Sequence, residues 1–191
     1  QLAIDDQGNI YVSILSHNIV RRISAIDNTV RTIAGISGQA GFAGDGGPGH
    51  LALLRKPSGI ACDAGGAVFF TDEENQRVRK LHYDADSDEW LIDTVIGSGE
   101  EFGVDINDLN VAVPIIFQMA PGSMGFVIPP LDQLDQPFDA YLADYQNNRL
   151  VFRNGQTTRI TAFAGTGEYG FDGDGGPALE ARFAYPRAVW P

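Results

Sequence analysis

The residues best suited to binding a cation lie in a glycine-rich segment near the end of the chain. Asp172 and Asp174 stand at alternate positions beside glycines, which is how a Ca²⁺-binding loop begins. No glutamate follows at the position that would bind the ion with both oxygens, and an earlier copy of the segment has Ala43 where Asp172 stands. We therefore assign no metal site here, and expect Asp174 and its counterpart Asp45 to cap turns or the short helix that follows.

Other residue types that could carry chemistry are spread along the chain. The acidic run at 84–89 has the composition of a solvated hairpin tip rather than of a cation site. His17, His50 and His82 fall at different places in the strand pattern, so their spacing predicts no zinc site. No serine has a Gly-x-Ser-x-Gly context, and the glycine-rich segments lack the Lys-Ser/Thr ending of a phosphate loop. The sequence predicts no catalytic residue, no metal ligand and no cofactor.

The elements that would position such residues recur along the chain. The segment at 3–23 aligns without gaps with the segment at 61–81, and a third copy begins at Tyr141. Each copy has the pattern strand, glycine turn, strand, polar turn, strand, and a fourth strand closes it. Four short antiparallel strands per unit predict one blade of an all-β propeller. The expected units are blade one at about 1–40, blade two at about 57–97, blade three at about 122–165, and a connector that begins another blade at 166–191.

Two motifs recur within and between these units. The connector Gly-Phe-x-Gly-Asp-Gly-Gly-Pro occurs at 41–48 and at 170–177, and each copy precedes a short run compatible with a helix, at 51–56 and 178–184. The hairpins of blades two and three carry Asp-x-x-Asn-x-Arg. This hairpin motif predicts an asparagine in the left-handed conformation and two ion pairs. The predicted pairs are Asp72 with Arg77 and Asp144 with Arg149. Blade one has Ile14 and Ile19 at these positions, so we expect its turn to be held differently.

Together these motifs resemble the NHL-repeat β-propeller family, and the resemblance covers nearly the whole chain. It rests on Thr-Ile-Ala-Gly, the connector motif, Pro-x-Gly-Ile-Ala and the Asp-x-x-Asn-x-Arg-Val hairpin. It implies a parent propeller of six blades. Propellers need about four to eight blades to close, so about three blades form an incomplete ring with apolar faces exposed. We expect the remaining blades of the same propeller, or a second copy of the chain, to cover those faces.

Composition limits the partners. The chain of 191 residues has 25 Asp and Glu against 13 Lys and Arg, and its formal net charge is −12. A surface this acidic repels phosphate backbones, so nucleic acid is not an expected partner. No stretch approaches the roughly 18 apolar residues of a membrane span. The single Cys62 lies in an apolar run and is expected to behave as a small hydrophobe. The acidity and the habit of the resembling family favour an extracellular or periplasmic location.

Blade building accounts for every clear motif, which favours a non-enzymatic scaffold that binds a protein or a small ligand within a larger protein. The insertion at 98–138 is a long loop, and such a loop serves either to bind a partner or to cover a blade face. The alternative function is part of a metal-dependent propeller enzyme of the lactonase or lyase kind, which similar folds include. That alternative requires ligands that these three blades do not visibly supply.

Overall fold

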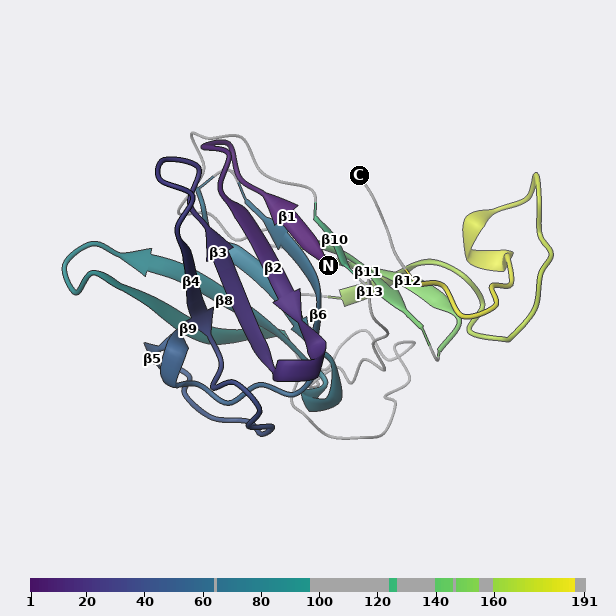
Figure 1. Cartoon of the computed structure of the whole chain (residues 1–191). Coiled ribbons are helices and arrows are strands. Elements are labelled where there is room, and N and C mark those ends of the chain that lie inside the picture. Colours follow the sequence, from purple (N-terminus) through teal and green to yellow (C-terminus); the bar gives the residue numbers. More distant parts are fainter. Residues whose placement is uncertain (64, 97–123, 127–139, 146, 155–159, 188–191) are drawn as a thin grey trace.

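Three antiparallel sheets follow one another along the chain, as the computed structural model in Figure 1 shows. The structure describes residues 1–63, 65–96, 124–126, 140–145, 147–154 and 160–187. Sheet one contains β1 (Leu2–Ile4), β2 (Ile10–Ile14), β3 (Ile19–Ile23) and β4 (Val30–Ala34), in that order. Sheet two contains β6 (Pro57–Cys62), β7 (Val68–Asp72), β8 (Arg77–Asp84), β9 (Glu89–Ile96) and, on the outer edge of β9, β5 (Gly47–Pro48). Sheet three contains β10 (Met124–Phe126), β11 (Ala140–Asp144), β12 (Arg149–Arg153) and β13 (Ile160–Ala164).

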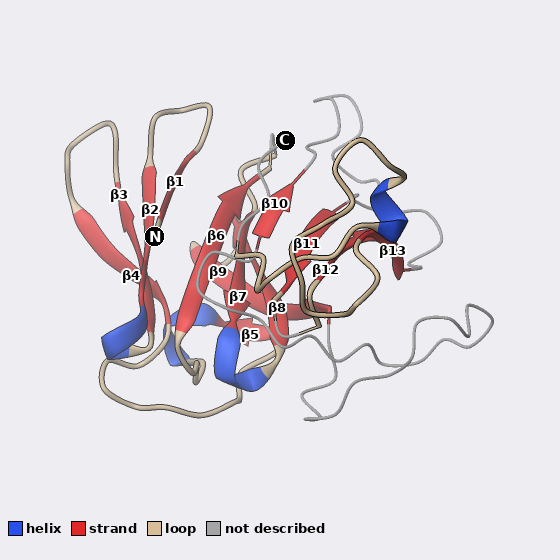
Figure 2. Cartoon of the chain, turned by 90° about the vertical axis from the view of Figure 1, so that its right-hand side faces the viewer, coloured by secondary structure: helices blue, strands red, loops and turns tan. Residues whose placement is uncertain are grey.

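The sheets are propeller blades, and the prediction of an all-β propeller with about three four-stranded blades is confirmed. Figure 2 shows them side by side in chain order, from β1–β4 to β10–β13. Each blade has a bulge at the same place in its third strand, after Val20, Val78 and Leu150. A bulge adds twist to a sheet, and its recurrence shows that the repeat extends to backbone geometry.

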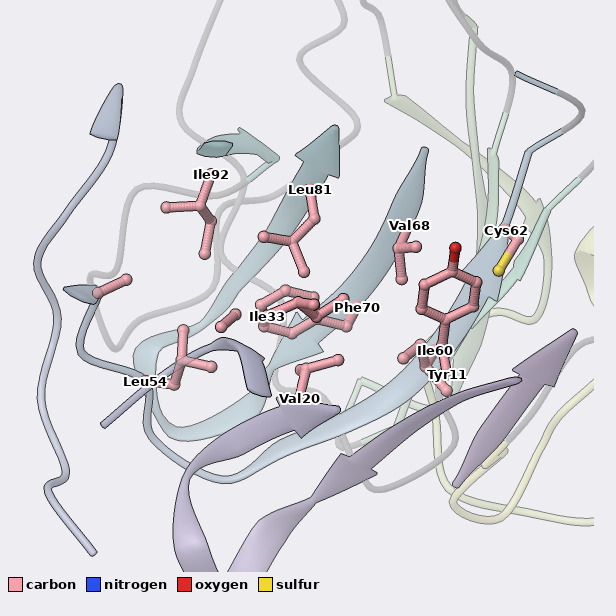
Figure 3. Packing of buried hydrophobic residues seen from close by; sticks show 12 residues of the cluster. Tyr11, Val20, Ile33, Leu54, Ile60, Cys62, Val68, Phe70, Leu81 and Ile92 are labelled. Atoms are coloured by element: carbon pink, nitrogen blue, oxygen red, sulfur yellow. The ribbon is translucent and has the colours of Figure 1, made fainter. Parts of the chain in front are cut away.

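The core lies between sheets one and two, with a second cluster between sheets two and three. β7 is buried along its whole length because it is covered on both faces. Side chains alternate between the faces of a strand, so Val68 and Phe70 belong to the first cluster and Phe69 to the second. Figure 3 shows the first cluster, in which Tyr11 from β2 and Cys62 from β6 lie close to Val68. Packing on both faces of sheet two therefore holds neighbouring blades together.

The connectors contain less helix than the sequence predicted. Single 3-10 turns form at η2 (Gly49–Leu51) and η5 (Ala178–Glu180), not across 51–56 and 178–184. In the first connector Leu53 forms a bridge with Ala43, and Leu54 forms one with Ala40 and is fully buried. A helical turn would remove these pairings, so the connector folds back on itself in extended form instead.

Of the two predicted hairpin ion pairs, one forms and the other does not. Asp144 pairs with Arg149 at 2.8 Å, as expected. Asp72 instead pairs with Arg79, at 3.1 Å, and both side chains are fully buried. The guanidinium of Arg77 lies over the ring of Phe42, 3.8 Å from its centroid. The pairing of Asp72 with Arg77 was therefore wrong, because the docked connector holds Arg77 on its phenylalanine.

The left-handed residue of each hairpin follows η1 (Leu15–His17), η3 (Glu73–Asn75) or the corresponding turn of sheet three. These residues are Asn18, Gln76 and Asn148, with φ of 56°, 52° and 49°. In both motif hairpins this position is therefore one residue after the motif asparagine, Asn75 or Asn147. The amide of Asn75 donates instead to Asp72 Oδ2 and to the carbonyl of Gly41. The first hairpin has Ile14 and Ile19 in place of the Asp and Arg, so it lacks their ion pair, as expected. Asn18 Oδ1 accepts the backbone N–H of Lys56, and Asn148 Oδ1 accepts that of Tyr185 in the same way in the third hairpin.

Asp45 does not cap the short helix. Its Oδ1 lies 2.6 Å from Nη2 of Arg79, and η2 has Pro48 at its N-cap and no side-chain capping bond. The capping role expected from the sequence was therefore wrong for this residue. Asp45 instead fastens the connector to the buried arginine of the next blade.

Candidate functional site

A cleft of about 710 Å³ opens between sheet one and sheet two. One wall is the face of sheet one that carries Tyr11 and Ile33, and the other is the face of sheet two near Trp90. The turns at 5–9 and 63–67 and the hairpin tip between β8 and β9 form its rim. A volume of this size is typical of a small-molecule pocket, since such pockets span about 300–1,000 Å³.

Aromatic side chains from both blades close the inner part of the cleft. Tyr11 meets Trp90 edge to face, with ring centroids 5.8 Å apart and an interplanar angle of 71°. Tyr83 tilts against the same indole, also at 5.8 Å, and remains half exposed. Offset and edge-on contacts of this kind are favourable. The cleft therefore has an aromatic side on sheet two.

The carboxylate of Asp5 organises one corner of the rim. It accepts bonds from the backbone N–H groups of Gln7 and Asn9, from the Asn9 amide at 2.8 Å and from the Tyr11 hydroxyl at 3.0 Å. Burial would raise the pKa of Asp5, but these hydrogen bonds outweigh it and lower the pKa. Burial and the neighbouring Asp5 raise the pKa of Tyr11 well above its ordinary value. Both groups therefore keep their ordinary neutral-pH forms and serve to shape the rim.

Two arginines lie opposite each other on the wall of sheet one. Arg22 on β3 and Arg31 on β4 are cross-strand partners, and Arg22 is also opposite Tyr11. Directly opposite residues share a face, so both side chains belong to the cleft, which they line. Arg22 donates from Nη2 to Asn9 Oδ1 at 2.8 Å, whereas its buried Nε has no partner. Neither arginine forms an ion pair within the described part of the chain.

Two of the three histidines line this cleft. His50 from η2 and His82 from β8 line it, and His50 Nδ1 lies 3.3 Å from Glu89 Oε2. His17 is elsewhere, in η1, with its Nδ1 2.9 Å from the hydroxyl of Ser16. Among the described residues no three His, Cys, Asp or Glu side chains are placed to hold a metal ion together.

The acidic segments singled out in the sequence are engaged within the protein. Both oxygens of Asp172 lie 3.0 Å from Nε of Arg182, and this bond lowers the pKa of Asp172. The two residues form a bridge where the first connector pairs Ala43 with Leu53, so an ion pair replaces an apolar pair.

At the 84–89 tip, Asp84 accepts the hydroxyl of Ser87 and the N–H of Asp86. Asp88 accepts the hydroxyl of Tyr83. The insertion at 98–138 lies outside the described residues, except for β10.

Sequence reasoning missed the residues that make the cleft. Arg22 and Arg31 lie in segments that served there only as strands of the repeat, and Tyr83 and Trp90 were not singled out. The pattern of alternating side chains could have placed each of them on a face of its own strand. No local signal could have shown that Trp90 of one blade would contact Tyr11 of another.

Comparison with known proteins shows the fold and no more. No family model matches the chain, and no curated protein matches it. An auxiliary nutrient binding protein from Bacteroides thetaiotaomicron is similar in structure, with 20% identity, a TM-score of 0.64, and 97% of this chain and 40% of that one covered.

An auxiliary nutrient binding protein from Bacteroides ovatus gives 17% identity, a TM-score of 0.67, and 98% and 41% coverage. A structural genomics protein of unknown function from Bacteroides thetaiotaomicron has 18% sequence identity and a TM-score of 0.65, and the match covers 100% of this chain and 41% of that one. The chain thus spans about two fifths of the length of these proteins. In the described part of the chain no helix is long and apolar enough to cross a membrane.

Proposed function

We propose that this chain is a ligand-binding segment of an NHL-repeat propeller and acts as a non-enzymatic scaffold. The observation that carries the proposal is the 710 Å³ cleft between sheets one and two, with an aromatic side and a polar side. The blade units are those expected at about 1–40, 57–97 and 122–165, with the connector at 166–191.

A small ligand suits this cleft better than a protein does. The volume is in the range of small-molecule pockets, and a few placed polar groups beside aromatic rings are the usual means of orienting such a ligand. Two of the structurally similar proteins are described as auxiliary nutrient binding proteins, which is compatible with a propeller that holds small molecules.

The proposal is tested by thermal unfolding of the full chain with a panel of sugars, organic acids and short peptides. A ligand at 100 times its Kd stabilises the fold by about 2.7 kcal/mol, which corresponds to a rise of roughly 5–10 °C for a protein of this size. Tyr83→Ala removes the half-exposed ring of the cleft and should weaken binding. Tyr169→Ala removes a similarly exposed ring from the second connector and should not.

Chemical analysis of the bound molecule completes the test. A scaffold returns its ligand unchanged, so mass spectrometry after a long incubation should recover the starting compound. Turnover of any ligand would contradict the non-enzymatic assignment. Equal loss of affinity in both tyrosine variants would show that the ligand binds outside the cleft.

A further inference from the structure

Among the described residues that line the cleft, one arginine nitrogen is a buried donor without a partner, whereas no carboxylate lacks one. The four carboxylates of the cleft each accept at least one hydrogen bond or face a histidine within the protein: Asp5, Asp63, Asp88 and Glu89. On the wall of sheet one, the buried Nε of Arg22 has no partner among the described residues, and Arg31 has no ion pair with a described residue. A ligand that supplies acceptors would therefore complete the cleft, whereas a cation would not.

The two arginines are also placed at a cost that a ligand can offset. They are directly opposite each other on neighbouring strands, where like charges destabilise a sheet. This repulsion is relieved when one oxyanion accepts bonds from the two guanidinium groups, whose planar forks match a carboxylate.

The aromatic side of the cleft lies across from this pair. The Tyr83 hydroxyl interacts with groups on both walls of the cleft. Its bond to Asp88 raises the pKa of Tyr83, whereas the positive charge of Arg31 lowers that pKa. Trp90 stands between Tyr83 and Tyr11, and Tyr11 is the cross-strand partner of Arg22. A molecule whose charged end reaches the arginines therefore has a ring face of sheet two beside it.

We propose that Arg22 and Arg31 together bind the carboxylate of a small organic acid whose ring lies against Trp90 and Tyr83. This inference rests on the proposed function and names the ligand class. A monoanionic carboxylate fits better than a phosphate dianion, because the rim carboxylates of Asp5 and Asp88 and the net charge of −12 repel a second negative charge more strongly.

The test uses matched probes in which a carboxylate replaces an uncharged hydroxymethyl group. Glucuronate is compared with glucose, and benzoate with benzyl alcohol, by the fluorescence of Trp90 in the full chain. Trp190→Phe removes the other tryptophan from the signal. The carboxylates should change the emission of Trp90 and bind at least about tenfold more tightly than their uncharged counterparts, since a hydrogen bond to a charged group contributes about 1.5–3 kcal/mol.

The variants locate the charge that matters. Arg31→Gln should weaken carboxylate binding at least about tenfold, and Arg22→Gln should do so as well. Arg21→Gln is the control, because Arg21 neighbours Arg22 on β3 but its side chain belongs to the other face. It should leave affinity within about twofold. Arg31 is exposed on a surface strand, so its variant should fold even where Arg22→Gln, which loses the bond to Asn9, does not.

Each other outcome overturns the inference. If glucose or benzyl alcohol binds as tightly as its acid, the cleft holds ligands but the arginines do not select charge, and the proposed function survives alone. If Arg21→Gln loses as much affinity as Arg31→Gln, the attraction is a general field and not this pair. If neither acid changes the emission of Trp90 up to about 10 mM, the carboxylate assignment is wrong.

Discussion

Replacing Arg79 with methionine should destabilise the chain more than any change on its surface. Arg79 is fully buried on β8 and pairs with Asp72, which is also fully buried. In the variant, Asp72 keeps the N–H of Arg55 at 2.6 Å and the amide of Asn75 at 2.8 Å but loses its countercharge. Breaking one side of a buried pair costs about 3–5 kcal/mol, because the other charge is left uncompensated.

The loss should be visible by thermal unfolding. For a protein of this size about 1 kcal/mol shifts the Tm by 2–4 °C, so Arg79→Met should lower it by roughly 6–20 °C. Asp45→Asn is the matched control. It removes the other countercharge of the same guanidinium, but the Asp45 side chain is 38% exposed and an ion pair in that setting contributes at most about 1 kcal/mol.

The pH dependence has a defined sign. Burial raises the pKa of Asp72 above 3.8, and the charge of Arg79 holds it down in part. A carboxyl with a raised folded-state pKa contributes stability below its unfolded pKa and loses that contribution as the pH rises through the folded value. Removing Arg79 raises the pKa of Asp72 in the folded state further. The loss of stability in Arg79→Met should therefore be greatest at pH 7 and shrink toward pH 4.

The double variant Asp72→Asn/Arg79→Met provides the decisive comparison. It leaves no buried charge, so it should be more stable at pH 7 than Arg79→Met alone. The prediction is wrong if the double variant is no more stable than Arg79→Met. It is also wrong if Arg79→Met loses less than about 1 kcal/mol of stability and this loss is independent of pH.

Three further predictions concern the connector, the cleft and the thiol. Ca²⁺ or a chelator should leave the Tm nearly unchanged, and a Ca²⁺-dependent rise in Tm that is lost in Asp172→Ala would indicate a metal site after all. Asp172→Ala/Arg182→Leu copies the apolar pair of the first connector, so its Tm should be within a few degrees of the wild type. Arg31→Thr should raise the stability of the ligand-free chain by about 0.2–1 kcal/mol by denaturant unfolding, because it removes the like charge opposite Arg22; a lower stability would show that the two charges do not repel. Burial raises the pKa of Cys62 to about 12, so alkylation at pH 8 should be roughly a thousandfold slower than for a free thiol, and rapid labelling of the folded chain would contradict that burial.

Local pattern was enough to find the blades. Repetition of short strand-like runs gave the strands near Ile10, Val68 and Tyr141, and the glycine and asparagine turns between them gave the hairpins. These signals are readable because each depends on residues that are close together along the chain. The ion pair of Asp144 with Arg149 was predictable for the same reason, since the two residues are directly opposite in one hairpin.

Contacts between separate units were not predictable in this way. Asp72 has a facing arginine in its own hairpin, Arg77, yet it pairs with Arg79, because the connector brings Phe42 onto Arg77 and Asp45 onto Arg79. A motif cannot show which of two arginines a docked connector will engage. The helical runs failed for a related reason, since the connector pairs with itself.

The sequence by itself determined the repeat, the antiparallel strands and the acidic charge of the chain, because each depends on neighbours along the chain or on composition. Only the tertiary structure decided where a ligand could bind. Trp90 and Tyr11 are far apart in sequence and meet because two blades pack face to face. The pairing of β3 with β4 sets Arg22 and Arg31 on one face, and the packing of sheet two makes that face a wall of the cleft.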